Sequence, residues 1–268
     1  MKLLRTESPN AVWYHSVALE AAGVQHAFST RIGGVSAPPF DSLNFGNPAG
    51  FDQRDPLEAI TENHRRLLKN AFSPAQYEVL RVHQVHGNRV IVATPEGPWD
   101  NSTQADGIIS TSSAQLASVR TADCAPILLC TEDGLAVAAV HAGWRGVVAE
   151  IVPIAVAQLR QFHPGKALHA AIGPCIGPHA FEVGPEVLDA FAALFGDAPP
   201  IITRQPNGKG HVDLRLAIFR QLQTKGIEED KIDSSDRCTF RDKGEFFSHR
   251  REAGLTGRMI SLIGPRAV

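Results

Sequence analysis

The sequence lacks the features that would place it in a nucleic-acid-binding, membrane or secreted class. Its 26 Lys and Arg residues nearly balance 28 Asp and Glu residues, so it has no basic excess for a nucleic-acid surface. No apolar run approaches the roughly 18–20 residues that cross a bilayer. Glu7 and Pro9 stand where a signal peptide would continue its apolar stretch. We therefore expect a cytoplasmic protein without nucleic-acid or membrane partners.

Cysteine is scarce, and its placement does not suggest a disulfide framework. Cys124, Cys130, Cys175 and Cys238 are widely spaced, and no C-x-x-C motif indicates a zinc ribbon or a thioredoxin-type redox pair. We expect some of these thiols to be free. The chain is otherwise that of an ordinary globular protein, because 43% of its residues are hydrophobic and only 20% are charged.

The chain also lacks a linker that would divide it, since it has no Ser/Gly-rich tract, no block of like charge and no repeat. We therefore expect one domain over residues 1–268. Two segments, 32–51 and 196–210, are expected to be loops. The first is expected to be ordered because Phe40, Leu43, Phe45 and Phe51 give it apolar anchors.

Helix signals are clear at four places. A helix is predicted to begin near Asp55, which can cap it, with Pro56 at the first helical position and Glu58 at capping-box spacing. A long helix is predicted over residues 147–162, and two more over residues 185–195 and 214–225. Asp213 is the expected cap of the last helix.

Apolar runs predict strands between these helices. The expected strands lie at residues 78–83, 89–93, 107–111, 116–120, 126–130, 135–140 and 168–172. Glu132, Asp133 and Gly134 join the fifth and sixth of these strands as a plausible hairpin. The grouping predicts an α+β fold with a mixed or antiparallel sheet covered by helices.

Three polar residues, His86, Cys124 and His141, stand at the ends of apolar strands, where a rigid scaffold presents reactive groups. Each alone is also typical of a structural residue, either a hydrogen-bonded histidine or a small buried cysteine. If the three converge, they would form the open three-ligand site of a catalytic zinc, which would also accept copper. Without metal they could form a Cys/His nucleophile pair. His83 is not expected to share an ion with His86, because residues three apart in a strand point to opposite faces.

The segment after His141 suggests an anion site. Gly143 and Gly146 flank Arg145 where a strand leads into a helix, so backbone N–H groups and a guanidinium could bind phosphate or carboxylate. The same glycines could merely form a tight turn with an arginine on the surface. Cys175 is expected to be structural or pocket-lining, and nothing ties the loop residue His179 to a metal.

Motifs spread over nearly the whole chain resemble one family. In chain order they are residues 28–31 with 33–36, 42–46, 84–87, 105–107, 122–126, 140–146, 172–177, 238–239, and 247–251 with 257–258. This combination resembles the YfiH family, whose members are called laccase-domain or multicopper polyphenol oxidase proteins, purine nucleoside phosphorylases and peptidoglycan editing factors. His249 departs from the family pattern, which has Tyr there.

The resemblance implies a layered α/β/β/α fold in which His86, Cys124 and His141 converge as zinc ligands. It implies phosphorolysis of adenosine, inosine, guanosine and methylthioadenosine together with adenosine deamination, so purine nucleosides and phosphate are the expected partners. The turn from Gly143 with Arg145 is the first candidate phosphate cradle, and Arg31 is a weaker one. The oxidase name implies copper, but the chain has none of the paired His-x-His motifs of multicopper oxidases.

Two rival functions remain open. An amidase-like editing hydrolase would remove L-serine from a misloaded UDP-MurNAc precursor, with Cys124 as nucleophile or zinc ligand and His141 or His86 as base. A non-enzymatic protein would use the three residues only to sequester metal. Sequestration favours a fourth protein ligand, and the sequence offers none near the three.

Overall fold

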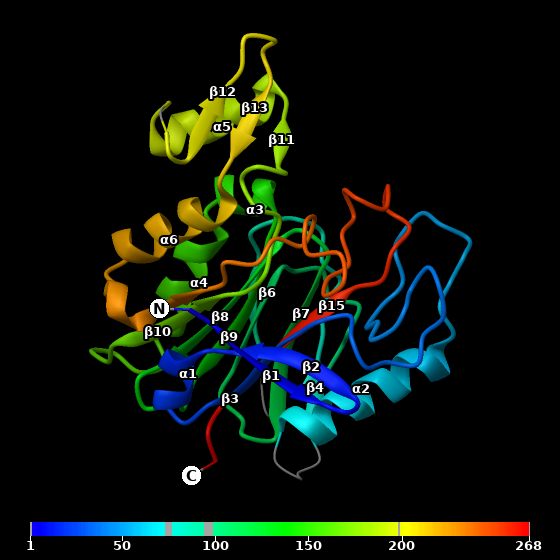
Figure 1. The fold of residues 1–268 in the computed structure, drawn as a ribbon. Helices are drawn as coiled ribbons and strands as arrows, with labels where there is room; N and C mark the ends of the chain where they lie inside the picture. The colour runs from blue at the N-terminus through cyan, green and yellow to red at the C-terminus, as the bar shows by residue number, and fades with distance from the viewer. Residues whose placement is uncertain (1, 73–76, 94–98, 198, 268) are drawn as a thin grey trace.

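Two stacked six-stranded sheets form the centre of the molecule in the computed structural model, which describes residues 2–72, 77–93, 99–197 and 199–267 (Figure 1). In spatial order, the first sheet contains β1 (Leu4–Ser8), β2 (Ala11–His15), β3 (Gln25–Ser29), β15 (Met259–Gly264), β7 (Gln115–Thr121) and β4 (Glu78–Leu80). The second contains β14 (Ile232–Ser234), β10 (Leu168–Ile172), β8 (Ala125–Thr131), β9 (Val137–Ala142), β6 (Gly107–Ser110) and β5 (Val90–Val92).

The helices are α1 (Val17–Ala21), α2 (Leu57–Ala71), α3 (Trp144–Val148), α4 (Ile151–Leu159), α5 (Pro185–Phe195), α6 (Leu214–Thr224) and the 3₁₀ turn η1 (Glu229–Lys231). Helix α2 covers the outer face of the first sheet, and α4 and α6 cover that of the second. A small sheet of β11 (Glu182–Val183), β13 (Gly210–Val212) and β12 (Ile202–Arg204) stands with α5 at the top of Figure 1. None of the helices in the described part of the chain combines the length and apolar character that crossing a membrane requires.

Three clusters of buried apolar side chains fill the spaces between the layers. Phe28 of the first sheet packs in one cluster with Ile108 and Leu128 of the second. A second cluster joins the outer face of the second sheet to α4 and α6, and a third joins Leu116 and Leu262 of the first sheet to Leu67 of α2. These layers confirm the α+β prediction and the α/β/β/α order. The sheets are mixed, because β4 and β7, β5 and β6, and β10 and β14 pair in parallel while the other pairs are antiparallel.

Several predicted elements are confirmed. The β8–β9 hairpin forms, with Leu128 opposite Ala139. Helix α5 has the expected bounds, and Asp213 caps α6 by accepting a hydrogen bond from the Leu216 N–H at 3.0 Å. Strand β9 continues to Ala142, so His141 lies inside the strand and not beyond its end.

The single long helix predicted over residues 147–162 is wrong. Helix α3 already begins at Trp144 and ends at Val148. The helical conformation is interrupted at Glu150, whose φ is 59°, and α4 begins at Ile151. Pro153 gives the reason, because proline has no N–H and is tolerated only in the first turn of a helix. A continuous helix would place Pro153 in its interior.

The predicted cap of α2 is also wrong. Helix α2 begins at Leu57 after Pro56, without a side-chain cap. The Asp55 carboxylate instead accepts hydrogen bonds from Ser36 Oγ and Asn44 Nδ2, at 2.5 and 2.8 Å. These donors come from the 32–51 loop, which the structure shows as ordered and which folds over this carboxylate.

The loop expected over residues 196–210 contains a strand. Ile202 pairs with Val212, and Arg204 pairs with Gly210, so β12 and β13 form a short antiparallel pair. A three-residue strand is too short for an alternating pattern to be visible in the sequence, and its pairing with β13 comes from the tertiary fold.

Buried His26 predicts a dependence of stability on pH. Burial lowers the pKa of His26 from 6.5 to about 4. Below pH 6.5, His26 therefore binds a proton in the unfolded chain but stays neutral in the folded chain, so the stability of the fold falls as the pH drops from 6.5 toward 4. The loss from this group at pH 5 is about 2 kcal/mol.

We expect His26→Gln to be less stable at pH 7.5 but to lose less stability on acidification, because its amide does not titrate. Urea unfolding at pH 7.5 and pH 5 measures the two losses. Equal losses in the variant and the parent protein would contradict this role of His26.

Candidate metal centre

The fold brings His86, Cys124 and His141 together from three separate segments. Their ligand atoms all lie within 4.8 Å of one another. Cys124 directly precedes β8, and Pro126 of β8 pairs with His141 of β9, so the hairpin places the thiol beside the imidazole. His86 lies in the loop between β4 and β5, and its ring centroid is 4.8 Å from that of His141. His83 is not part of the cluster, and its backbone forms an isolated β-bridge with that of Gln104.

The cluster is open on one side. His141 is buried, Cys124 is half-buried and His86 is exposed, so solvent or a small molecule reaches the cluster from the His86 side. The Cys124 Sγ lies 4.0 Å from the His86 Nδ1. No fourth His, Cys, Asp or Glu joins the cluster within the described ranges.

Asp106 orients two members of the cluster, and the sequence reading assigned it no role. This fully buried carboxylate accepts hydrogen bonds from the backbone N–H groups of Val85, His86 and Gly87, at 3.2, 3.0 and 2.7 Å. Its Oδ1 also lies 2.8 Å from the Nδ1 of His141, which leaves the Nε2 of that ring for the cluster. The three N–H groups hold His86 in a left-handed conformation with φ 59°. An acidic residue at the start of the apolar strand β6 was the available signal.

Asp123 supports the cluster from the other side and was also missed as a functional candidate. Its φ is 95°, an uncommon value for a residue with a side chain, and it stands directly before Cys124. Its carboxylate accepts hydrogen bonds from Thr239 Oγ1 at 2.6 Å, Ser248 Oγ at 3.0 Å and the Arg250 N–H at 2.7 Å. These bonds fix the segment that carries His249 against the Cys124 turn.

The charges of the cluster favour a thiolate. Burial opposes ionisation of Cys124, but the charge of His141 and hydrogen bonds from both histidines outweigh it and lower the pKa of Cys124 to about 6. Burial likewise opposes charge on His141, but Cys124 and Asp106 outweigh it and raise the pKa of His141 to about 9. The thiolate is the form of cysteine that binds metals and acts as a nucleophile.

The donor set fits a zinc ion with an open position. One thiolate and two imidazoles are ligands that zinc accepts, and three protein ligands are typical of catalytic zinc sites. The contact between Asp106 and His141 is the carboxylate–histidine arrangement that fixes the tautomer of a metal-binding imidazole. The described residues therefore provide both the ligands and the outer support of such a site.

Gly143 lies against the cluster, which gives the glycine of the predicted anion turn a different local role. A Cβ at this position would lie 3.0 Å from both the Cys124 Sγ and the His86 Nδ1. Only a residue without a side chain lets the backbone after β9 approach so closely.

We therefore expect Gly143→Ala to lower metal affinity by about 10–100-fold, as for changes that displace metal ligands. Titration of the metal-free protein with Zn²⁺ measures the affinity, and thermal unfolding shows whether the fold survives. Gly244→Ala is the matched control because a Cβ there meets nothing within 4 Å. Equal zinc affinity in the two variants would contradict this role.

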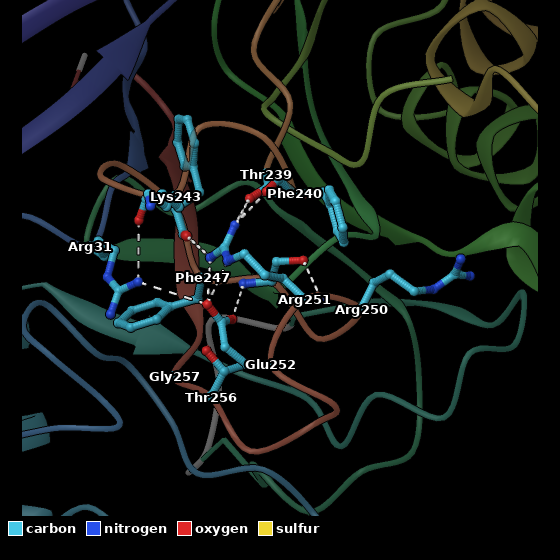
Figure 2. A network of polar contacts seen from close by, with 12 residues as sticks. Arg31, Thr239, Phe240, Lys243, Phe247, Arg250, Arg251, Glu252, Thr256 and Gly257 are labelled. Atoms are coloured by element: carbon cyan, nitrogen blue, oxygen red, sulfur yellow. Dashed lines mark hydrogen bonds and ion pairs between the residues drawn. The ribbon is translucent and has the colours of Figure 1, made fainter. Parts of the chain in front are cut away.

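The two arginines predicted to bind phosphate have other contacts. Arg145 is exposed, and its guanidinium carbon lies 4.4 Å from the centroid of the Trp144 ring. Arg31 donates to the Asp41 carbonyl at 2.7 Å and forms an ion pair with the Asp41 carboxylate at 3.1 Å. Its guanidinium also stacks over the Phe247 ring (Figure 2). Figure 2 also shows Arg31 directed at Lys243 and Glu252. These contacts occupy the guanidinium group of Arg31.

The remaining candidates lie outside the cluster. Cys175 is buried and its thiol is free. Its backbone forms an isolated β-bridge with that of Cys238, whose free thiol accepts a hydrogen bond from the Gly177 N–H at 3.1 Å. His179 is exposed on a loop. His249 is exposed as a residue, but partial desolvation of its ring together with the charge of Arg258 lowers its pKa.

Comparison with known proteins gives the family. The family model described as multi-copper polyphenol oxidoreductase laccase matches residues 25–266. A Shigella flexneri protein named purine nucleoside phosphorylase YfiH is 42% identical over 241 residues, covering 90% of this chain and 93% of the relative. An Escherichia coli protein of the same name is 41% identical over the same shares. The crystal structure of YlmD from Geobacillus stearothermophilus matches with a TM-score of 0.85 and 30% identity, over 99% of this chain and 100% of that chain. The chain therefore belongs to the multi-copper polyphenol oxidoreductase laccase family, which is the YfiH family that its motifs resemble.

Proposed function

We propose that this chain is a zinc-dependent purine nucleoside phosphorylase that acts on adenosine, inosine, guanosine and methylthioadenosine and also deaminates adenosine. The observation that carries the proposal is the convergence of His86, Cys124 and His141 into one open cluster. The names of the relatives, purine nucleoside phosphorylase, favour nucleosides as the substrates. One cluster with three ligands, the only such group within the described residues, favours mononuclear zinc over the several copper ions of a multicopper oxidase.

His86, Cys124 and His141 would hold the zinc ion. When bound, zinc supplies a Lewis acid and a water of lowered pKa, which is the nucleophile that replacing the 6-amino group of adenosine requires. The chain's own contribution is orientation. Asp106 keeps the His141 proton on Nδ1 and fixes the His86 backbone, and Gly143 allows the chain to pass beside the thiol.

Phosphorolysis makes a separate demand on the chain. A phosphate oxygen forms a bond to C1′ of the ribose while the bond from C1′ to the base nitrogen breaks, and the base leaves with that electron pair and takes up a proton. The residues around the cluster must therefore hold a nucleoside and a phosphate next to each other. The open side of the cluster, at exposed His86, is where a nucleoside would enter.

The proposal is tested on purified protein whose metal content is measured. Zinc-loaded protein with phosphate is expected to convert inosine into hypoxanthine and ribose 1-phosphate, and adenosine into adenine and inosine. Failure to form any of these products would refute the proposal. Serine release from a misloaded UDP-MurNAc peptide by the same sample would identify the editing hydrolase instead.

Metal removal gives a further prediction. Chelation to the metal-free protein is expected to abolish turnover, and stoichiometric Zn²⁺ is expected to restore it, because the thiolate and imidazoles lose the ion they position. Circular dichroism should change little, since the ligands lie on strands and turns held by their own hydrogen bonds. Full turnover by protein shown to be free of metal would favour the Cys/His nucleophile alternative.

A further inference from the structure

Three arginines, Arg81, Arg120 and Arg258, form a group in which no guanidinium makes an ion pair with a carboxylate of the described residues. The guanidinium of Arg258 donates only to the backbone carbonyls of Thr256 and Gly257, both at 2.9 Å. The side chains of Arg81 and Arg120 form no ion pair or hydrogen bond with a described group. Two other arginines that are largely shielded from solvent have carboxylate partners, Arg31 with Asp41 and Arg251 with Glu252.

Strand register places the three arginines on one face of the first sheet. Arg120 of β7 pairs with Ile260 of β15, and Arg258 stands two residues before Ile260 on the same strand line. Leu80 of β4 pairs in parallel with Ala117, so Arg81 extends β4 alongside Ser118, two residues before Arg120. Because residues two apart in a strand share a face, the three side chains start from the same side of the sheet.

The segment from Asn44 to Gly46 and helix α2 cover this group. A Cβ on Gly46 would lie 2.5 Å from one terminal nitrogen of Arg120, so this glycine lets the loop rest directly on the guanidinium. His64 of α2 packs edge-on against Phe45, with 5.1 Å between the ring centroids. Its Nε2 is buried and has no hydrogen-bond partner in the described structure. The cover thus adds a ring nitrogen, and its nearby carboxylate, Asp55, accepts hydrogen bonds from Ser36 and Asn44 and makes no ion pair with the three arginines.

The positive charges repel one another. Burial, together with the charges of Arg81 and Arg258, lowers the pKa of Arg120. Burial and the charges of Arg81 and Arg120 lower the pKa of His64 to about 4, so its ring is neutral. Half-buried like charges that make no ion pair destabilise a fold, and an anion bound between them would reduce that cost.

The group lies beside the metal cluster. Met259 pairs with Thr121, so Arg258 falls next to Ala122, two residues before Cys124. The strand register therefore places Arg258 beside the segment that leads into Cys124. An anion held by the arginines would therefore sit next to a substrate at the cluster.

We propose that Arg81, Arg120 and Arg258 bind a phosphate oxyanion, with the N–H of His64 as a further donor. Guanidinium groups match phosphate oxygens in charge and geometry. This proposal rests on the proposed function, in which phosphate is the second substrate, and it moves the phosphate site from Arg145 and Arg31 to the arginine group. The same chemistry would bind the phosphate of a nucleoside 5′-monophosphate.

Direct binding tests the site without relying on turnover. Calorimetric titration of the zinc-loaded full chain with inorganic phosphate, at constant ionic strength, should give a dissociation constant that Arg120→Gln raises at least about tenfold. Arg65→Gln is the matched control, since Arg65 is exposed on α2 and paired with Glu62. Phosphate should also raise the unfolding temperature of the parent protein more than that of Arg120→Gln. A parallel titration with inosine 5′-monophosphate distinguishes free phosphate from a phosphate carried by the nucleoside.

A second variant keeps the charge and moves only the guanidinium. Gly46→Ala should displace the flexible end of Arg120 and weaken phosphate binding, while Gly244→Ala should not. Both Arg120→Gln and Gly46→Ala should raise the KM for phosphate and leave adenosine deamination within about twofold, because deamination consumes no phosphate.

Four outcomes decide the proposal. Unchanged phosphate binding in Arg120→Gln and in Gly46→Ala would overturn it, as would an effect confined to Arg145→Gln. Equal losses of deamination and phosphorolysis would also overturn it, since the arginines would then act by disturbing the metal cluster. Phosphate binding that depends on Arg120 in a protein without phosphorolysis would support the site and refute the proposed function.

Discussion

Replacing Cys124 by Ala is expected to lower nucleoside turnover by at least about 100-fold. Loss of an outer partner of a metal ligand already costs about 10–100-fold in metal affinity or activity, and Cys124 is the predicted ligand itself. The variant should also bind less zinc, since two histidines would remain of the three ligand groups. Steady-state kinetics and zinc content, measured on the same sample, test both effects.

The control for Cys124→Ala is Cys130→Ala. Cys130 is fully buried in β8, and burial raises the pKa of its thiol, so it is a structural residue remote from the chemistry proposed here. Its replacement should cost stability through a small cavity and leave zinc content unchanged. If Cys124→Ala turned over nucleosides at the rate of Cys130→Ala, the assignment of the cluster would be wrong.

Asp106→Asn is expected to reduce zinc affinity and turnover by about 10–100-fold and to destabilise the fold as well. Each carboxylate oxygen of Asp106 faces two ring or backbone nitrogens, so the amide NH₂ of Asn would meet donors whichever way it turned. With the NH₂ toward the ring, His141 could keep this contact only by moving its proton to Nε2, the atom that faces the cluster. That change removes the lone pair a metal needs.

The readouts for Asp106→Asn separate positioning from unfolding. Zinc affinity is measured below the unfolding temperature, where circular dichroism shows the variant to be folded. Asp52→Asn, at an exposed position, is the control for the charge change. A variant that is destabilised yet binds zinc as tightly as the parent protein would limit Asp106 to a purely structural role.

Local signals in the sequence were enough for much of the fold. Helix α5 and the Asp213 cap of α6 follow from a proline or aspartate at the helix start and apolar residues at helical spacing. Strands β8 and β9 follow from two apolar runs joined by a turn. Strands β1 to β3 and β15 were not predicted. The pairing of β3 with β15 joins residues more than 230 positions apart, such as Leu262 with Ala27, and no local pattern encodes such a contact. Strands β1 and β2 are different, because they form a local hairpin that the sequence reading missed.

The candidate site divides in the same way. The sequence by itself determined the candidate residues, because His86, Cys124 and His141 are reactive groups next to apolar strands and lie in the motifs that resemble the family. Only the tertiary structure decided what surrounds them. Asp106 became the orienting carboxylate because β6 pairs with β9, which sets it beside His141.

The arginines illustrate the limit most clearly. In the sequence, Arg145 beside two glycines was the natural phosphate candidate, whereas Arg81, Arg120 and Arg258 are far apart and belong to no phosphate-binding motif. Their grouping results from β4, β7 and β15 lying side by side, and its lack of a counterion results from which residues α2 and the 32–51 loop place above it. The sequence determines which residues carry charge, but whether a charged side chain forms an ion pair depends on neighbours that only folding brings together.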